Sequence, residues 1–105
     1  MEAIVIYITA SSEKEAQHLS DVLLDNKAVA CVNIVPNVQS NYWWKGNKEK
    51  ASELLLIAKT RKTLLNKVIE LIKANHSYDV PEVIAIPIIG GNLDYLNWID
   101  EETGE

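Results

Sequence analysis

The segment from His76 to Glu82 combines residue types that can hold a divalent metal ion. Pro81 constrains the backbone between the imidazole and the carboxylate, so one loop can hold both side chains together. A histidine and a carboxylate suit Cu(II) or Zn(II), although two side chains do not complete a tetrahedral site. The same spacing fits a structural role, in which His76 closes a helix C-terminus and Glu82 pairs with a lysine. The spacing leaves both interpretations open.

Catalytic chemistry has weaker support in the sequence. Cys31 is the only cysteine and lies in a run rich in β-branched residues, where a buried and inert thiol is expected. Hydrolysis of acyl phosphates would need an arginine in the loop after the first strand. Residues 9–12 contain none, and Arg61 is the only arginine of the chain. We therefore predict that the protein is not an enzyme.

Three neighbouring aromatic residues, Tyr42, Trp43 and Trp44, form the other unusual segment. In a strand, Tyr42 and Trp44 would point to one face of the sheet and Trp43 to the other. Large rings beside a strand edge are more typical of a protein interface than of a ligand platform. Tyr95 and Trp98 of a C-terminal helix are expected to join this packing.

Hydrophobic periodicity predicts the elements that position these residues. Ser12 and Glu15 form a capping box that opens the first helix, and Thr60 or Thr63 is expected to cap the second. Asn92 is expected to cap a short last helix. The expected strands are residues 3–9, 28–35 ending at Pro36, 38–44, 54–58 and 83–89. A turn is expected at residues 45–48, and the second helix is expected to end near residues 75–76.

This order predicts an α+β fold, the ferredoxin-like split βαβ arrangement (βαββαβ plus a C-terminal helix). The 105 residues form a single domain, 1–105, in which two helices cover one face of a four-stranded antiparallel sheet. Right-handed crossovers place the first and third strands at the centre. The second strand and its hairpin are long for this fold, and a long apolar edge predicts a homo-oligomer.

Composition and charge exclude several partners. The net charge of −5 and the pI of about 5.0 argue against nucleic acid, and residues 53–59 lack the aromatics with which RNA-recognition domains stack bases. No apolar stretch approaches the length of a membrane span, so we expect no membrane partner. The N-terminus lacks the features of a secretion signal, and a single cysteine suits a reducing compartment. The expected location is the cytoplasm.

The chain as a whole resembles the CutA family, the divalent-cation tolerance proteins. The match runs in order along nearly the whole chain and is therefore specific. The residues that carry it are Tyr7-Ile8-Thr9, Ala30-Cys31-Val32-Asn33-Ile34 with Pro36, Ser40-x-Tyr42-x-Trp44-x-Gly46, Glu53, Lys59-Thr60, His76-x-Tyr78-x-x-Pro81-Glu82 and Tyr95-Leu96-x-Trp98-Ile99.

The resemblance implies a homotrimer joined by edge strands, similar in assembly to the PII signalling proteins, that binds Cu(II) or other divalent cations in metal-ion tolerance. Some members carry a copper-associated cysteine at the position of Ile8. The alternative is a PII-like signalling or scaffold trimer whose inter-subunit clefts bind a small metabolite, with Lys59 and Arg61 nearby. The metal ligands implied are His76 and Glu82, and the cleft residues implied are Tyr42, Trp44, Lys59 and Tyr78.

Overall fold

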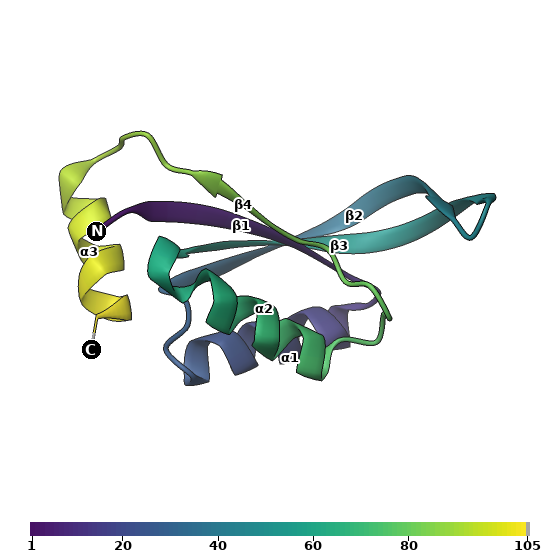
Figure 1. The fold of residues 1–105 in the computed structure, drawn as a ribbon, viewed down its shortest axis with the longest axis horizontal. Coiled ribbons are helices and arrows are strands. Elements are labelled where there is room, and N and C mark those ends of the chain that lie inside the picture. The colour runs from purple at the N-terminus through teal and green to yellow at the C-terminus, as the bar shows by residue number, and fades with distance from the viewer. Residues whose placement is uncertain (105) are drawn as a thin grey trace.

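The computed structural model describes residues 1–104 and shows a four-stranded sheet with helices (Figure 1). The strand order is β2-β3-β1-β4, and every neighbouring pair is antiparallel. The predicted ferredoxin-like arrangement, with the first and third strands at the centre, is confirmed. The elements are β1 (Ala3–Ala10), α1 (Glu13–Asp25), β2 (Cys31–Trp44), β3 (Asn47–Arg61), the 3₁₀ turn η1 (Lys62–Leu64), α2 (Leu65–Asn75), β4 (Val83–Pro87) and α3 (Leu93–Thr103).

The core lies between one face of the sheet and the helices α1 and α2, which Figure 1 shows on the same side. Side chains of β1 alternate between fully buried and half-buried, as a strand with one covered face requires. The opposite face is only partly covered by this chain, and Ile84 and Ile86 of β4 stay exposed there. The buried core residues are Ile4, Ile6, Ile8, Ala10, Ala16, Leu19, Leu23, Ala28, Val29, Leu54, Leu56, Ala58, Val68 and Ile72.

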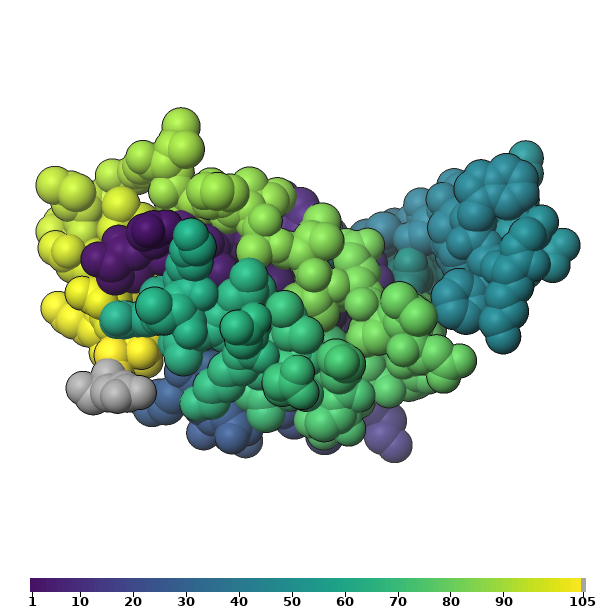
Figure 2. All heavy atoms as spheres, viewed as in Figure 1, coloured from purple at the N-terminus to yellow at the C-terminus, as the bar shows by residue number. Residues whose placement is uncertain are grey.

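The β2–β3 hairpin is longer than the sequence pattern predicted. β2 does not end at Pro36 but continues through it, with a register shift between Val35 and Val38. Since β2 is an edge strand, a proline there need not break a ladder hydrogen bond, and a bulge absorbs the irregularity. Lys45 and Gly46 both have positive φ, the turn geometry that matches strand twist. The hairpin projects from a molecule of 44 × 25 × 22 Å (Figure 2).

The predicted caps of the second helix are wrong. Neither η1 nor α2 begins with a side-chain cap, and Thr63 lies inside η1. Thr60 is a β3 residue paired with Ile4, and its buried hydroxyl donates a 2.7 Å hydrogen bond to the carbonyl oxygen of Ala28. Thr60 therefore ties β3 to the segment before β2.

Replacement of Thr60 by valine tests this role. The change keeps the shape of the side chain but removes the donor, which leaves a buried carbonyl with one bond fewer. We expect Thr60→Val to lower the free energy of unfolding by about 1 to 2 kcal/mol without shortening α2. Urea denaturation measures the first effect and circular dichroism the second. A loss of helix in the variant would restore the capping interpretation.

The C-terminal helix α3 lies at the end of the sheet opposite the hairpin tip (Figure 1). Asn92 caps it, as predicted, because its Oδ1 accepts a 2.9 Å hydrogen bond from the amide of Asp94. Arg61 holds the helix through an ion pair with Asp100 and a 3.0 Å bond to Thr103 Oγ1. Among residues 1–104, no helix combines the length and the apolar character needed to cross a membrane.

Candidate functional site

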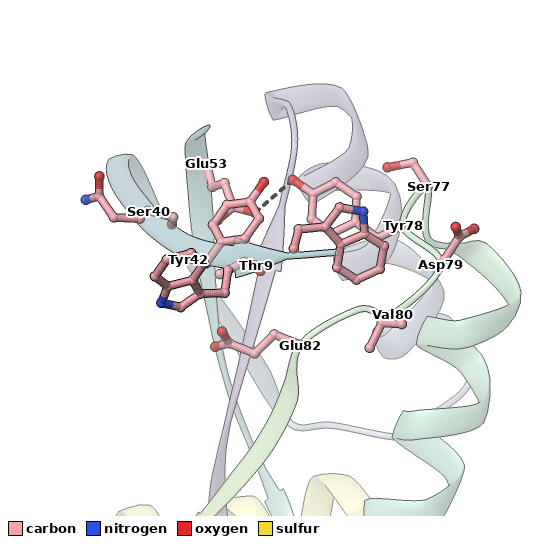
Figure 3. A pocket seen from close by; sticks show the side chains of 12 residues that line it. Thr9, Ser40, Tyr42, Glu53, Ser77, Tyr78, Asp79, Val80 and Glu82 are labelled. Atoms are coloured by element: carbon pink, nitrogen blue, oxygen red, sulfur yellow. Dashed lines mark hydrogen bonds between the residues drawn. The ribbon is translucent and has the colours of Figure 1, made fainter. Parts of the chain in front are cut away.

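A hollow of about 700 Å³, here called the hairpin pocket, lies beside the outer part of the β2–β3 hairpin (Figure 3). One wall comes from the hairpin, and the other comes from the loop between α2 and β4. Figure 3 shows Tyr42 and Tyr78 with their hydroxyls on the side of Glu53, while Glu82 reaches in from the segment before β4. The lining residues are Thr9, Ser40, Asn41, Tyr42, Trp43, Trp44, Glu53, Ser77, Tyr78, Asp79, Val80 and Glu82.

Three acidic residues line the hairpin pocket, Glu53, Asp79 and Glu82, and Glu53 is the buried one of the three. Glu53 is 7% exposed, and its Oε2 accepts a 2.8 Å hydrogen bond from the hydroxyl of Tyr78. Burial and this bond raise the pKa of Tyr78, so the phenol stays protonated and donates. Burial, together with the charge of Glu53, raises the pKa of Glu82. The ion pairs found within residues 1–104 include neither carboxylate.

The loop that carries Tyr78 and Glu82 is fastened to the start of α1 by Glu15. Its Oε2 accepts a 2.9 Å bond from the amide of Ser77, and its Oε1 accepts bonds from the amide and hydroxyl of Ser11. Burial alone would raise the pKa of Glu15, but the bonds from Ser11 and Ser77 outweigh it and lower the pKa to about 2. The capping box thus also positions the pocket wall.

His76 lies beneath the pocket wall and does not line the pocket. Its buried ring contacts two backbone groups: Nε2 is 2.7 Å from the carbonyl oxygen of Thr9, and Nδ1 is 3.0 Å from the amide nitrogen of Tyr78. A carbonyl only accepts, so Nε2 carries the proton and Nδ1 accepts from the amide. Both ring nitrogens are occupied, and ligation of a metal would require one bond to break. His76 is also the residue that closes α2, as the structural interpretation predicted.

Lys59 is not brought into the hairpin pocket. Its Nζ lies 3.7 Å from Cys31 Sγ and contacts Asn33 Oδ1, at the other end of the hairpin. Arg61 is engaged with α3, as described above. Neither cation faces the pocket, so this subunit gives no support to the alternative of a cleft that binds an anionic metabolite. Among the residues that the structure describes, no group of three or more His, Cys, Asp and Glu could hold a metal.

Of the predicted site residues, Tyr42, Trp44, Tyr78 and Glu82 come together in one pocket. Sequence reasoning missed Glu53 as a site residue. The sequence did contain an indication, because Glu53 stands directly before the apolar run of a central strand. Burying a charge at such a position costs free energy unless the charge is paired or has a function.

Comparison with known proteins identifies the family. Residues 4–102 match the family model of the CutA1 divalent ion tolerance protein. The chain belongs to the CutA family. It is 50% identical over 103 residues to "Protein CutA 1, chloroplastic" of Oryza sativa subsp. japonica, which covers 98% of this chain and 58% of that protein. It is 44% identical over 100 residues to the divalent-cation tolerance protein CutA of Thermus thermophilus, which covers 95% and 97%.

Solved CutA structures share the whole fold. The crystal structure of CutA1 from Oryza sativa has a TM-score of 0.96 at 48% identity and covers 100% of this chain and 96% of that one. The Thermus thermophilus CutA1 structure has a TM-score of 0.94 at 43% identity and covers 97% and 99%. The predicted resemblance is thereby confirmed. The chain spans just over half the length of the two plant CutA proteins that it matches.

Proposed function

We propose that this CutA chain is a non-enzymatic homotrimer that binds divalent cations, Cu(II) in particular, in metal-ion tolerance. The observation that carries the proposal is the hairpin pocket, in which Glu53 and Glu82 present two carboxylates with no basic residue in the lining. Burial, and then repulsion from Glu53, raises the pKa of Glu82, and a divalent cation between the two carboxylates would offset both effects. Family membership supports the same function.

The donor set fits a divalent cation but supplies only part of a coordination shell. Carboxylate oxygens bind divalent metals, and for a given oxygen and nitrogen site Cu(II) is favoured over the other divalent first-row ions. In this proposal Glu53 and Glu82 hold the ion, while water or a neighbouring subunit supplies the remaining ligands. His76, the ligand proposed from the sequence, would join them only if its bond to Thr9 or Tyr78 opened.

Calorimetric titration of Cu(II) into the metal-free protein, against a competing chelator at neutral pH, tests this function. We expect saturation near one ion per subunit. Loss of a ligand costs at least as much as loss of an outer-shell partner, so Glu82→Gln should weaken binding by about tenfold or more. Glu101→Gln, an exposed change on α3, serves as the charge-matched control. Weak heat without a defined stoichiometry would contradict the proposal.

His76→Gln separates the two ligand sets in the same titration. Glutamine can still bond backbone groups but has no imidazole nitrogen. Unchanged affinity would show that the carboxylates hold the ion without His76. A loss as large as that of Glu82→Gln would establish the pair His76 and Glu82 as predicted from the sequence.

The proposed location is the cytoplasm. Cys31 is a free thiol in the structure, and a free thiol suits a reducing compartment. Cell fractionation with an antibody against the chain tests this location.

A further inference from the structure

The hairpin pocket carries four aromatic rings that the metal proposal does not use. Tyr42, Trp44 and Tyr78 supply three of them, and the fourth belongs to Trp43, which would lie at a subunit contact in the proposed homotrimer. Metals take electron pairs from oxygen, nitrogen or sulfur atoms, so ring faces contribute nothing to a coordination shell. A ring face does attract an organic cation through its quadrupole, and the attraction grows when water is excluded. The rings therefore point to a second class of ligand.

The charged residues that line the pocket also favour a cationic ligand. Glu53, Asp79 and Glu82 are acidic, and no lysine, arginine or histidine lines the pocket. Glu53 is more than nine-tenths buried, and only its Oε2 bonds a protein group, the hydroxyl of Tyr78. Every fully buried polar side-chain atom of residues 1–104 has a partner, so the other oxygen of Glu53, a residue of the pocket lining, keeps some exposed surface. A buried anion without a counter-charge is costly, and a cationic ligand would remove that cost.

The protein already places an ammonium group on one of these rings. Lys45 Nζ lies 5.6 Å from the ring centroid of Trp44, within the range of a cation–π contact. This lysine belongs to the hairpin turn and does not line the pocket. The Trp44 ring thus already attracts one ammonium group from outside the pocket that it lines.

The size of the pocket separates an organic cation from a bare metal ion. A volume of about 700 Å³ lies in the range of small-molecule sites and is far larger than a bare metal ion fills. We infer that the hairpin pocket binds a small organic ammonium ion, with its charge between Glu53 and Glu82 and its substituents against Tyr42 and Trp44. This inference goes beyond the metal proposal and does not depend on it.

Tetramethylammonium chloride is the probe, titrated into metal-free protein and followed by calorimetry and tryptophan emission. We expect saturable binding, whereas potassium chloride and the uncharged tert-butanol produce none. Trp44→Leu and Glu82→Gln should each weaken binding by about fivefold, because each removes one of the two attractions. Trp98→Leu, a change of a similarly exposed tryptophan on α3, should bind as the unmodified protein does. Circular dichroism shows that each variant is folded.

Two results would overturn the inference. One is a response to tetramethylammonium no larger than that to potassium, and the other is equal affinity in the Trp44→Leu and Trp98→Leu variants. Trp44→Leu removes no metal ligand, so Cu(II) binding should not depend on this residue. The Cu(II) titration therefore separates failure of this inference from failure of the metal proposal. Copper binding without tetramethylammonium binding overturns this inference alone. The reverse result supports the inference and overturns the metal proposal alone.

Discussion

Replacing Glu15 by glutamine is expected to destabilise the protein by about 2 kcal/mol at neutral pH, although Glu15 lies outside the hairpin pocket. The carboxylate accepts hydrogen bonds from both Ser11 and Ser77, and a glutamine side chain has one acceptor oxygen in place of two. The lost bond frees either the start of α1 or the loop that carries Tyr78. Urea denaturation at pH 7 measures the loss.

The pH dependence of the same variant gives a sharper result. The pKa of Glu15 in the folded protein is about 2, below its ordinary value of 4.5. A lowered pKa stabilises the fold above the ordinary value, and the stabilisation is lost as the pH falls from about 4.5 towards 2. The difference in unfolding free energy between the unmodified protein and Glu15→Gln should therefore shrink over this interval. Glu13→Gln, an exposed change in the same helical turn, should show no such trend. If the difference in unfolding free energy did not change with pH, the carboxylate of Glu15 would be excluded as the source of that difference.

The residues around Glu15 show how far the sequence could predict the site. The contact between Ser12 and the amide of Glu15 depends on spacing within one helical turn, and the capping box predicted it. The bond from Ser77 joins residues 62 positions apart, which no local pattern contains. His76 was assigned two possible roles because its type suits both. Only the positions of Thr9 and the Tyr78 amide show that both ring nitrogens are occupied.

Lys59 shows a different limit. The motif residues of β3 include Glu53 and Lys59, which are six positions apart on one strand and therefore about 20 Å from each other. Register confirms the separation, since Glu53 faces Val38 and Lys59 faces Cys31. One subunit cannot place Lys59 in the pocket that Glu53 lines. A motif read along the chain shows which residues recur in a family, but strand geometry decides which of them share a site.

Charged replacements on the hairpin are expected to have the largest effect on assembly. Trp43 is 73% exposed near the tip of the hairpin, and Ile84 and Ile86 are exposed on the open sheet face. Exposed apolar surface of this kind, beside a free edge strand, is typical of an interface. In the proposed homotrimer each Trp43 would lie at a subunit contact. A buried interfacial tryptophan contributes about 2 kcal/mol or more to the free energy of association. Because the three subunits of a closed trimer make equivalent contacts, the replacement removes that amount at each contact.

Sedimentation velocity at a fixed protein concentration measures the result. Trp43→Lys and Val38→Lys should convert the trimer into monomers or aggregates, because a lysine at a desolvated contact loses hydration without gaining a partner. Asn66→Lys adds the same charge at an exposed position of α2, away from the hairpin, and should leave the trimer intact. A trimer that persists in both hairpin variants would show that the subunits associate through another surface. The open face around Ile84 and Ile86 would then be the next surface to test, by the same measurement on Ile86→Lys.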